Sequence, residues 1–194
     1  MKLYYSPLAC SLADHIALRE AGFDFDLERV DLRTHRTETG VDFHTVSAKG
    51  YVPALILDDG QMITENVALL DWIASQSPAL TQAGPLGRTR VLEALTYITT
   101  EIHRAFKPMW HAGTPAEKAA AAASVQTLMA PLEASLTDDF LFGDTPSVAD
   151  FYLFVMLLWA ERFGVETPDR LTALRDRLRA RPAVRAAMTA EGLP

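Results

Sequence analysis

Cysteine is almost absent from this 194-residue chain, in which Cys10 carries the only thiol. One cysteine cannot form an internal disulfide, and the N-terminus lacks the basic stretch, long apolar run and cleavage site of a signal peptide. We therefore expect a reducing, cytoplasmic environment. No apolar run reaches the roughly 18–20 residues that cross a bilayer, so we expect no membrane span. The net charge of −7 argues against a nucleic-acid partner.

Common catalytic motifs are missing as well. The sequence contains no glycine-rich phosphate loop, no GxSxG nucleophile elbow, no CxxC and no HExxH. The five histidines, at positions 15, 35, 44, 103 and 111, include no i, i+4 pair. We therefore expect neither a metal site nor a bound cofactor.

A segment rich in proline and glycine, 77–85, separates two parts with different patterns. Before it, strand-like and helical segments alternate, and Asp59-Gly60 is typical of a hairpin. The order βαβ followed by ββα predicts an α/β domain over residues 1–77 with a mixed four-stranded sheet. After it no convincing strand occurs, so we expect an all-α domain over residues 86–194.

The helices expected in the second part are long and amphipathic or fully apolar. Their ranges are 87–111, 115–136, 151–159, 171–181 and 183–190. Ser147 and Asp150 have the spacing of a capping box at the start of the third of these helices.

Cys10 lies between a strand-like run, residues 2–5, and a helical pattern over residues 11–21. Unpaired N–H groups and the helix dipole favour anions at a helix N-terminus. A cysteine there can have a lowered pKa and a usable thiolate. The alternative is that Cys10 is a small buried hydrophobic residue.

Two further segments suit a peptide-like ligand. If Pro53 is cis, the backbone of Val52 points outward and offers N–H and C=O to an extended peptide; the alternative is an ordinary loop with a trans proline. Asn66 is an N-cap candidate for the helix that follows. Free N–H groups there could hold a ligand carboxylate while Glu65 pairs with an ammonium, or Asn66 is a cap and nothing more.

A polar stripe is expected along the 87–111 helix. Thr96, Thr100, His103 and Lys107 fall at i, i+4, i+7 and i+11, on one face of an α-helix. The stripe is either a solvated face or a surface that faces a ligand.

A series of short motifs runs through nearly the whole chain. They are Ala-Cys10-Ser-Leu-Ala, His15-Ile-Ala-Leu-Arg-Glu20, Val30-Asp-Leu32, Lys49-Gly-Tyr-Val-Pro-Ala-Leu55, Leu57-Asp-Asp-Gly60, Thr64-Glu65, Glu101-Ile-His103-Arg-Ala-Phe106, Ser147-Val-Ala-Asp-Phe-Tyr-Leu-Phe154 and Ala190-Glu-Gly-Leu193. In this order the chain resembles a cytosolic glutathione transferase, most of all the bacterial beta class.

The resemblance implies a thioredoxin-like N-terminal domain, an all-helical C-terminal domain and a homodimer with a glutathione site in each subunit. It implies transfer of glutathione to hydrophobic electrophiles, as in detoxification, with glutathione as co-substrate. The implied catalytic residues are Cys10, Ser11 and His103. The implied glutathione contacts are Cys10, His35, Tyr51, Val52, Pro53 as a cis-proline, Glu65, Asn66, Thr96, His103 and Arg104. The implied electrophile pocket, between the domains, includes Phe106, Met109 and Trp110.

Four positions depart from the family pattern. His35 stands where lysine is frequent, which weakens the fixed positive charge at the glycyl end of glutathione and makes the grip on its carboxylate pH-dependent. Asn66 replaces serine or glycine, Thr96 replaces asparagine, and Arg104 replaces lysine.

Two other functions remain open on the sequence. Cys10 could be a nucleophile that forms a mixed disulfide with glutathione, in a thiol–disulfide oxidoreductase that needs glutathione to resolve the intermediate. The chain could also be a non-catalytic binding relative, although the intact segment 49–55 and Glu65 argue against this.

Overall fold

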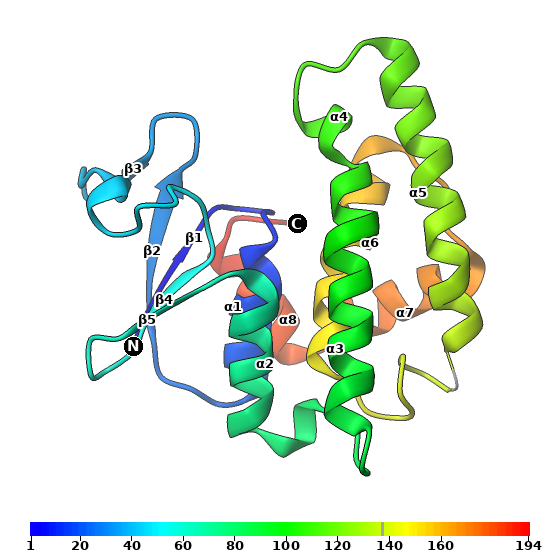
Figure 1. Cartoon of the computed structure of the whole chain (residues 1–194), viewed down its shortest axis with the longest axis horizontal. Helices are drawn as coiled ribbons and strands as arrows, with labels where there is room; N and C mark the ends of the chain where they lie inside the picture. The colour runs from blue at the N-terminus through cyan, green and yellow to red at the C-terminus, as the bar shows by residue number, and fades with distance from the viewer. Residues whose placement is uncertain (137) are drawn as a thin grey trace.

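A mixed β-sheet forms the N-terminal part of the chain (Figure 1), in a computed structural model that describes residues 1–136 and 138–194. Its strands are β1 (Lys2–Tyr5), β2 (Asp26–Asp31), β3 (Arg36–Thr37), β4 (Ala54–Ile56) and β5 (Met62–Thr64), in the spatial order β3-β2-β1-β4-β5. β1 and β2 are parallel, whereas β4 is antiparallel to β1 and β5 is antiparallel to β4.

The prediction of four strands was wrong by one, because β3 adds a fifth. The Asp31 carboxylate accepts hydrogen bonds from the N–H groups of Arg33 and Thr34, and His35 has a left-handed φ of 52°. These features turn the chain back so that β3 pairs antiparallel with the end of β2. Two residues are too few to show the period-2 pattern by which a strand is recognised.

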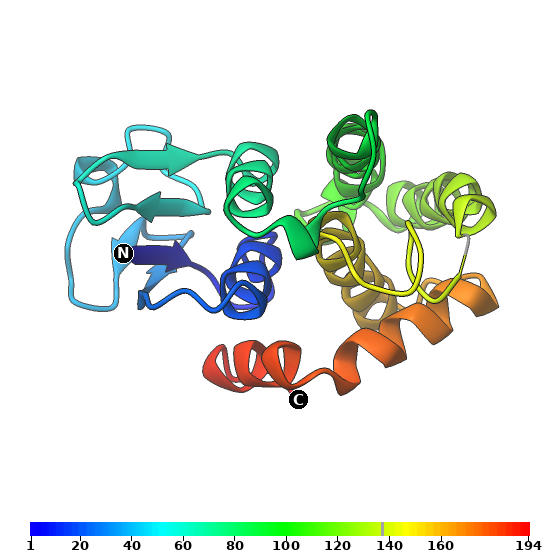
Figure 2. The same ribbon diagram turned by 90° about the horizontal axis from the view of Figure 1, so that it is seen from below.

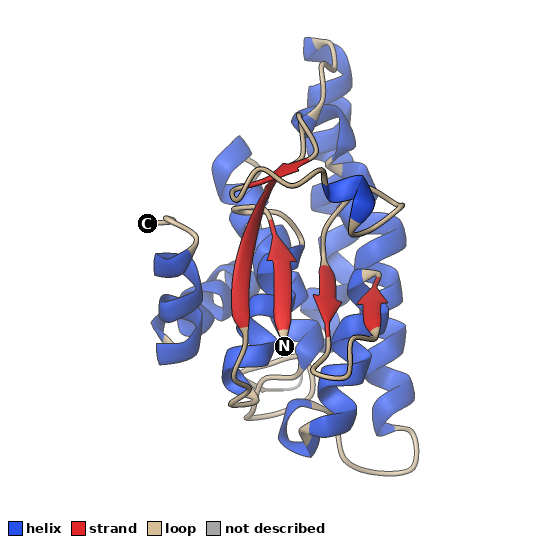
Figure 3. Cartoon of the chain, turned by 90° about the vertical axis from the view of Figure 1, so that its left-hand side faces the viewer, coloured by secondary structure: helices blue, strands red, loops and turns tan. Residues whose placement is uncertain are grey.

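Helices α1 (Ser11–Glu20) and α2 (Asn66–Gln76) cover one face of the sheet, which lies in front of them in Figure 3. On the opposite face, the rings of Tyr4 and Phe43 lie 5.4 Å apart in a small cluster with Val30, Val52 and Ala54. The carboxyl end of β1 leads directly into α1, so the loop before α1 lies at the edge of the sheet where ligands bind in many α/β proteins.

The C-terminal part is helical. Its elements are α3 (Gly87–Tyr97), a π-helical segment (Ile98–His103), α4 (Lys107–Trp110), α5 (Pro115–Ser135), α6 (Val148–Phe163), α7 (Asp169–Ala180) and α8 (Pro182–Ala190). Every residue from Val148 to Ala160 is buried, and α6 packs against α1, α2, α3 and α7. The last helix, α8, returns to lie beside α1 (Figure 2). In the part of the chain that the structure describes, no helix is long and apolar enough for a membrane span.

The single helix expected over residues 87–111 is wrong. A π-helical segment, Ile98–His103, follows α3, and α4 starts separately with Pro108 in its first turn, where a missing N–H is tolerated. A π turn accommodates an extra residue and rotates the subsequent residues relative to an α-helix. Of the predicted polar stripe, Thr96, Thr100 and Lys107 are exposed, as on a solvated face, whereas His103 is half-buried and leaves the stripe.

The capping box predicted at the start of α6 is confirmed. Asp150 accepts hydrogen bonds from the N–H of Ser147 at 2.8 Å and from its hydroxyl at 2.7 Å. Its second oxygen accepts from the N–H of Leu141 at 2.8 Å. These three hydrogen bonds are buried, and burial raises the pKa of the Asp150 carboxyl group to about 6.

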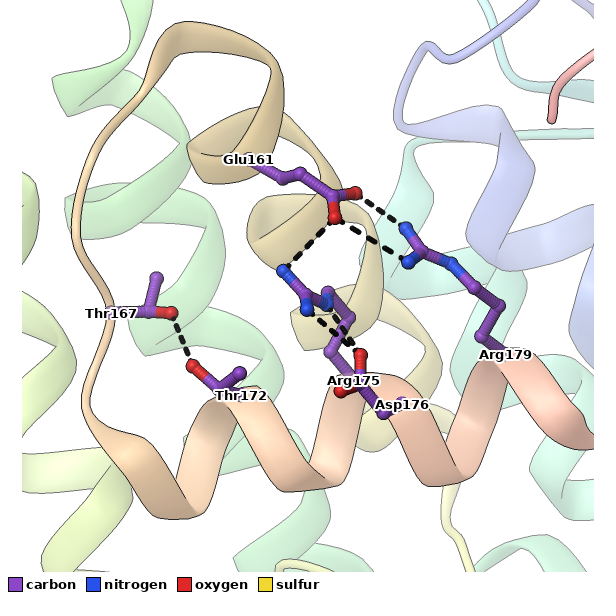
Figure 4. Close-up of polar contacts among 6 residues, drawn as sticks. All are labelled: Glu161, Thr167, Thr172, Arg175, Asp176 and Arg179. Atoms are coloured by element: carbon purple, nitrogen blue, oxygen red, sulfur yellow. Dashed lines mark hydrogen bonds and ion pairs between the residues drawn. The ribbon is translucent and has the colours of Figure 1, made fainter.

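An ion-pair network joins α6 to α7 (Figure 4). The Glu161 carboxylate lies 2.5 Å from Arg179 and 3.2 Å from Arg175, and Arg175 also lies 2.8 Å from Asp176. Arg179 is the largest cause that holds the pKa of Glu161 below its ordinary value. Single pairs of this exposure contribute about 0–1 kcal/mol each, so the network mainly fixes how α7 lies against α6.

Candidate functional site

Cys10 is the residue that precedes α1, and its Sγ lies 3.7 Å from the carbonyl oxygen of Val52. The Val52–Pro53 peptide bond is cis, as the family resemblance implied. Cys10 is only partly buried. The fold therefore brings the thiol and the Val52–Pro53 turn, 42 residues apart, into contact.

The expectation of a lowered thiol pKa is wrong. Burial raises the pKa of Cys10 to about 12, and Asp14 adds to the increase, as Glu65 does to a smaller extent. The N–H groups of Cys10 and Ser11 act in the opposite direction, as a helix N-terminus should, but they are outweighed. Cys10 is therefore a protonated thiol near pH 7.

The loop between β1 and α1 is held from the C-terminal part of the chain. Leu8 has a left-handed φ of 59°, donates its N–H to Glu191 at 3.1 Å, and accepts a 2.7 Å hydrogen bond from the indole of Trp159. Ser11 is fully buried, and its hydroxyl oxygen accepts a hydrogen bond from the N–H of Ser6 at 3.3 Å. Ser11 therefore supports this loop; its predicted catalytic role is not tested.

The segment before α2 carries an acidic group with a ready ammonium partner. Glu65 caps α2 with a left-handed φ of 72°, accepts from the Tyr51 hydroxyl at 2.7 Å, and forms an ion pair with Lys49. The hydrogen bond from Lys49 is the first cause that lowers the pKa of Glu65, so the carboxylate is charged near pH 7. This carboxylate already binds an amine, which is the chemistry predicted for it.

Asn66 is not the N-cap that the sequence suggested, because it is the first residue inside α2. Its buried amide nitrogen, in the orientation that satisfies its neighbours, donates to Asp14 at 2.5 Å and to the carbonyl of Cys10 at 3.2 Å. Asp14 is fully buried, and burial raises its pKa well above the ordinary value. Asn66 thus joins the start of α2 to the start of α1.

His103 meets the same region from the helical part. Its Nδ1 lies 2.6 Å from the Tyr152 hydroxyl, and its ring contacts Trp159 edge-on with centroids 4.9 Å apart. Because Trp159 also binds the Leu8 carbonyl, it connects His103 to the loop that carries Cys10. Burial lowers the pKa of His103, so its imidazole is neutral near pH 7.

The predicted electrophile pocket needs a correction. Phe106 is fully buried, and its ring centroid lies 5.5 Å from that of Trp159. Met109 is only 8% exposed, so both residues belong to the hydrophobic core. Trp110 is 37% exposed and contacts Trp159 and Phe163 edge-on. The aromatic surface that a ligand can reach is therefore provided by Trp110.

Three further predicted residues are His35, Thr96 and Arg104. Half-buried His35 has Nδ1 2.9 Å from the Gly50 carbonyl, and its ring lies tilted against that of His44 with the centroids 4.6 Å apart. Gly50 has a φ of 69°, and a Cβ there would meet the His44 ring at 2.3 Å, so this turn requires glycine. Thr96 and Arg104 are exposed on the helical part.

Four residues of this region were not selected as site residues from the sequence: Asp14, Tyr152, Trp159 and Glu191. Asp14 could have been found, because it lies four residues after Cys10 on the same helix. Glu191 is buried, and its second oxygen lies 2.9 Å from Nδ1 of His15. Tyr152 and Trp159 belong to an apolar run in which nothing marks their polar atoms. Across the described residues, no group of three or more His, Cys, Asp or Glu side chains is arranged to hold a metal.

Comparison with known proteins gives the same family in both parts of the chain. Residues 9–76 match the model "Glutathione S-transferase, N-terminal domain", and residues 115–190 match "Glutathione S-transferase, C-terminal domain". A curated relative, glutathione S-transferase GstA of Escherichia coli O157:H7, is 40% identical over 100% of both chains. A Sphingomonad glutathione S-transferase, solved in complex with glutathione, is 48% identical with a TM-score of 0.92. A beta-class enzyme of Sphingomonas chungbukensis is 45% identical with a TM-score of 0.93, and both structures match over 100% of each chain. This chain belongs to the glutathione S-transferase family.

Proposed function

We propose that this protein transfers reduced glutathione to hydrophobic electrophiles. The observation that carries the proposal is the meeting of Cys10, the Val52 carbonyl and the start of α2 with Glu65. A strand-like backbone, an ammonium-binding carboxylate and free N–H groups at a helix start are what an extended γ-glutamyl peptide needs. The complex of the Sphingomonad relative with glutathione supports the same ligand.

Binding begins with the two charged ends of glutathione. Glu65 takes the γ-glutamyl ammonium, which displaces or joins the Lys49 ammonium now paired with it. The N–H groups at the start of α2 take the adjacent carboxylate. Val52 pairs with the cysteinyl backbone, so the glutathione sulfur lies beside Cys10. His35 lies at the glycyl end.

Activation requires that the glutathione thiol lose its proton to bulk water, because the thiolate is the nucleophile. The acidic neighbours Asp14 and Glu65 do not favour a second anion, so neutral donors must stabilise it. Cys10, which keeps its proton, donates S–H, and neutral His103 donates N–H. The sulfur then forms a bond to an electrophilic carbon whose leaving group departs with the electron pair of the broken bond. Trp110 offers the apolar surface on which such an electrophile binds.

The raised pKa of the Cys10 thiol argues against Cys10 as the nucleophile of an oxidoreductase. A thiol with a pKa of about 12 is almost entirely protonated at pH 7, whereas attack on a disulfide requires the thiolate. The non-catalytic alternative has no feature in its favour, since Glu65 is charged and accessible.

The direct test combines binding and turnover. Calorimetry with glutathione should detect one site per chain, and absorbance should follow conjugation with 1-chloro-2,4-dinitrobenzene. Cys10→Ala should retain glutathione binding and lose part of the conjugation rate, since it removes one thiolate donor. Absence of both binding and turnover in the wild-type protein would refute the proposal.

We also propose a homodimer built on the exposed face of α3. A surface groove of about 630 Å³ lies there, lined among others by Leu86, Thr96 and Thr100. Leu86 is 57% exposed and lines the groove together with Leu92 and Tyr97, so the groove offers apolar surface that a second copy can cover. In such a dimer Thr96 faces the partner subunit. Light scattering should give twice the 21.4 kDa mass of one chain, and a 21.4 kDa particle would contradict the dimer.

A further inference from the structure

We infer that the aromatic surface at Trp110 selects aromatic electrophiles that carry a carboxylate, and that the guanidinium of Arg162 binds this carboxylate. The inference rests on the proposed function and narrows its substrate class, from hydrophobic electrophiles in general to aromatic acids. It adds a residue at the end of α6 that the sequence did not single out.

Arg162 lies on the side of α6 that faces the loop before Cys10. It is three residues after Trp159, and residues three apart share a face of a helix. Trp159 donates its indole N–H to the Leu8 carbonyl, and its ring centroid lies 5.1 Å from that of Trp110. The guanidinium carbon of Arg162 lies over the Trp110 ring, 5.4 Å from its centroid. The cation is therefore placed at the surface proposed for the electrophile.

The charge of Arg162 is not neutralised by an acidic neighbour. Its side chain is exposed, and among the described residues it forms no ion pair, whereas most arginines of the helical part do. The arginines that form ion pairs there are Arg88, Arg90, Arg175, Arg177, Arg179 and Arg181. A guanidinium over an aromatic ring still presents its N–H donors as a fork, which matches the two oxygens of a carboxylate.

The segment around α4 adds positive charge beside Trp110. Residues 102–116 contain Arg104 and Lys107 but no Asp or Glu. Lys107 is three residues before Trp110, in the same turn of α4. Residues 1–77 instead carry 6 Lys or Arg and 12 Asp or Glu, a net charge of −6. An anionic electrophile is thus attracted to the helical side of the site and repelled from the sheet side, so its carboxylate points away from Cys10 and its reacting carbon toward it.

A matched pair of chlorinated arenes tests this preference. 4-Chloro-3,5-dinitrobenzoate carries its carboxylate opposite the reacting carbon, and 4-chloro-3,5-dinitrobenzamide is a neutral analogue of nearly the same shape. In both, the sulfur of the glutathione thiolate forms a bond to the carbon that holds chlorine, and chloride leaves with the electron pair of the broken bond. Dividing each kcat/KM by the rate constant of the uncatalysed reaction removes the difference in intrinsic reactivity.

The wild-type protein should favour the benzoate over the benzamide by about ten-fold in this corrected kcat/KM, as expected for one charge-assisted, bidentate contact. Arg162→Gln should remove the preference, because the fork of donors and its charge are lost. Equal corrected values for the two probes in the wild-type protein would overturn the inference. A preference that survives Arg162→Gln would also overturn it.

Arg185→Gln is the matched control for charge. Arg185 is exposed on α8, which packs against α1 and α7, and its replacement changes the net charge by the same amount. The preference for the benzoate should keep its wild-type value in this variant. A loss as large as that in Arg162→Gln would mean a general effect of net charge, and the inference would fail.

Calorimetry separates this inference from the proposed function. 3,5-Dinitrobenzoate and 3,5-dinitrobenzamide lack the chlorine, so their binding is measured without glutathione and without turnover. The benzoate should bind the wild-type protein about ten-fold more tightly than the benzamide, and Arg162→Gln should remove this difference. A protein that shows the difference but conjugates neither chlorinated probe would refute the proposed function alone. A protein that conjugates both probes with equal corrected kcat/KM would overturn the inference alone.

Discussion

Alkylation of Cys10 measures directly how far the folded protein suppresses its own thiolate. Cys10 is the only cysteine of the chain, so every equivalent of iodoacetamide that reacts with a thiol reports on this position. The same chain unfolded in denaturant provides the reference, because there the thiol returns to an ordinary pKa. The comparison separates the effect of the fold from the chemistry of the reagent.

The expected difference follows from the two pKa values. At pH 7 a thiol of pKa about 12 is ionised to roughly one part in 10⁵, against roughly one part in 10² at the ordinary 9.0. The thiolate of a weaker acid is the better nucleophile, and a Brønsted slope of about 0.4–0.5 recovers a factor of roughly 16–30. The folded protein should therefore react about 30- to 60-fold more slowly, before any steric protection is counted.

The assay is the rate of mass increase on alkylation, measured from about pH 7 to about pH 10 for both states. The rate for the folded protein should rise ten-fold per pH unit across this range, whereas the rate for the unfolded chain should level off near pH 9. Asp14→Asn should speed the folded reaction, because the Asp14 charge is the second cause of the raised thiol pKa. A folded rate equal to or above the unfolded rate at pH 7 would refute the reasoning.

Four further changes test the site and its supports. Glu65→Gln should raise the KM for glutathione about ten-fold or more with little change in kcat, because a charge-assisted hydrogen bond is lost; an unchanged KM in steady-state kinetics contradicts the role. His35→Lys, which places a fixed positive charge at the glycyl end, should lower the KM for glutathione in the same kinetics; an unchanged KM contradicts the proposed place of His35. Glu191→Ala should lower the free energy of unfolding, measured in urea, by about 2–4 kcal/mol. The reason is that the Leu8 N–H and the buried His15 ring both lose their hydrogen-bond partner. Asp150→Ala should cost about 2–4 kcal/mol in the same assay, and a loss below about 1 kcal/mol would show that the relief of a buried charge outweighs the lost hydrogen bonds.

Local signals in the sequence were sufficient for most of the fold. Periodicity and turn residues predicted the α/β part, the helical part and the capping box at Ser147, because each depends on residues close together in the chain. The cis bond before Pro53 was implied by the family resemblance and is present, whereas the contact of Val52 with Cys10 was not predicted. Strand β3 was not predicted, because two residues carry no periodic pattern and only their pairing with β2 makes them a strand.

The register of the helix after residue 87 could not be read from periodicity. The apolar positions Leu95, Ile98, Ile102 and Phe106 fit an α-helix by spacing, and all four are buried. A π segment preserves this burial while it changes which polar residues share a face. His103 consequently belongs to the interior, against Tyr152 and Trp159, and not to the exposed stripe that its spacing indicated.

The sign of the Cys10 pKa shift shows where the sequence argument failed for the site. The thiol does lie at a helix N-terminus, and the N–H groups there do lower its pKa. The larger causes, burial and the carboxylate of Asp14, raise the pKa. Asp14 lies one turn along the same helix and accepts a hydrogen bond from the amide of Asn66. Burial depends on the packing of α2 and α6 against α1, which no local pattern reveals. A cysteine in such a place keeps its proton, so it can assist the thiolate of a bound tripeptide as a donor more readily than it can replace that thiolate as a nucleophile.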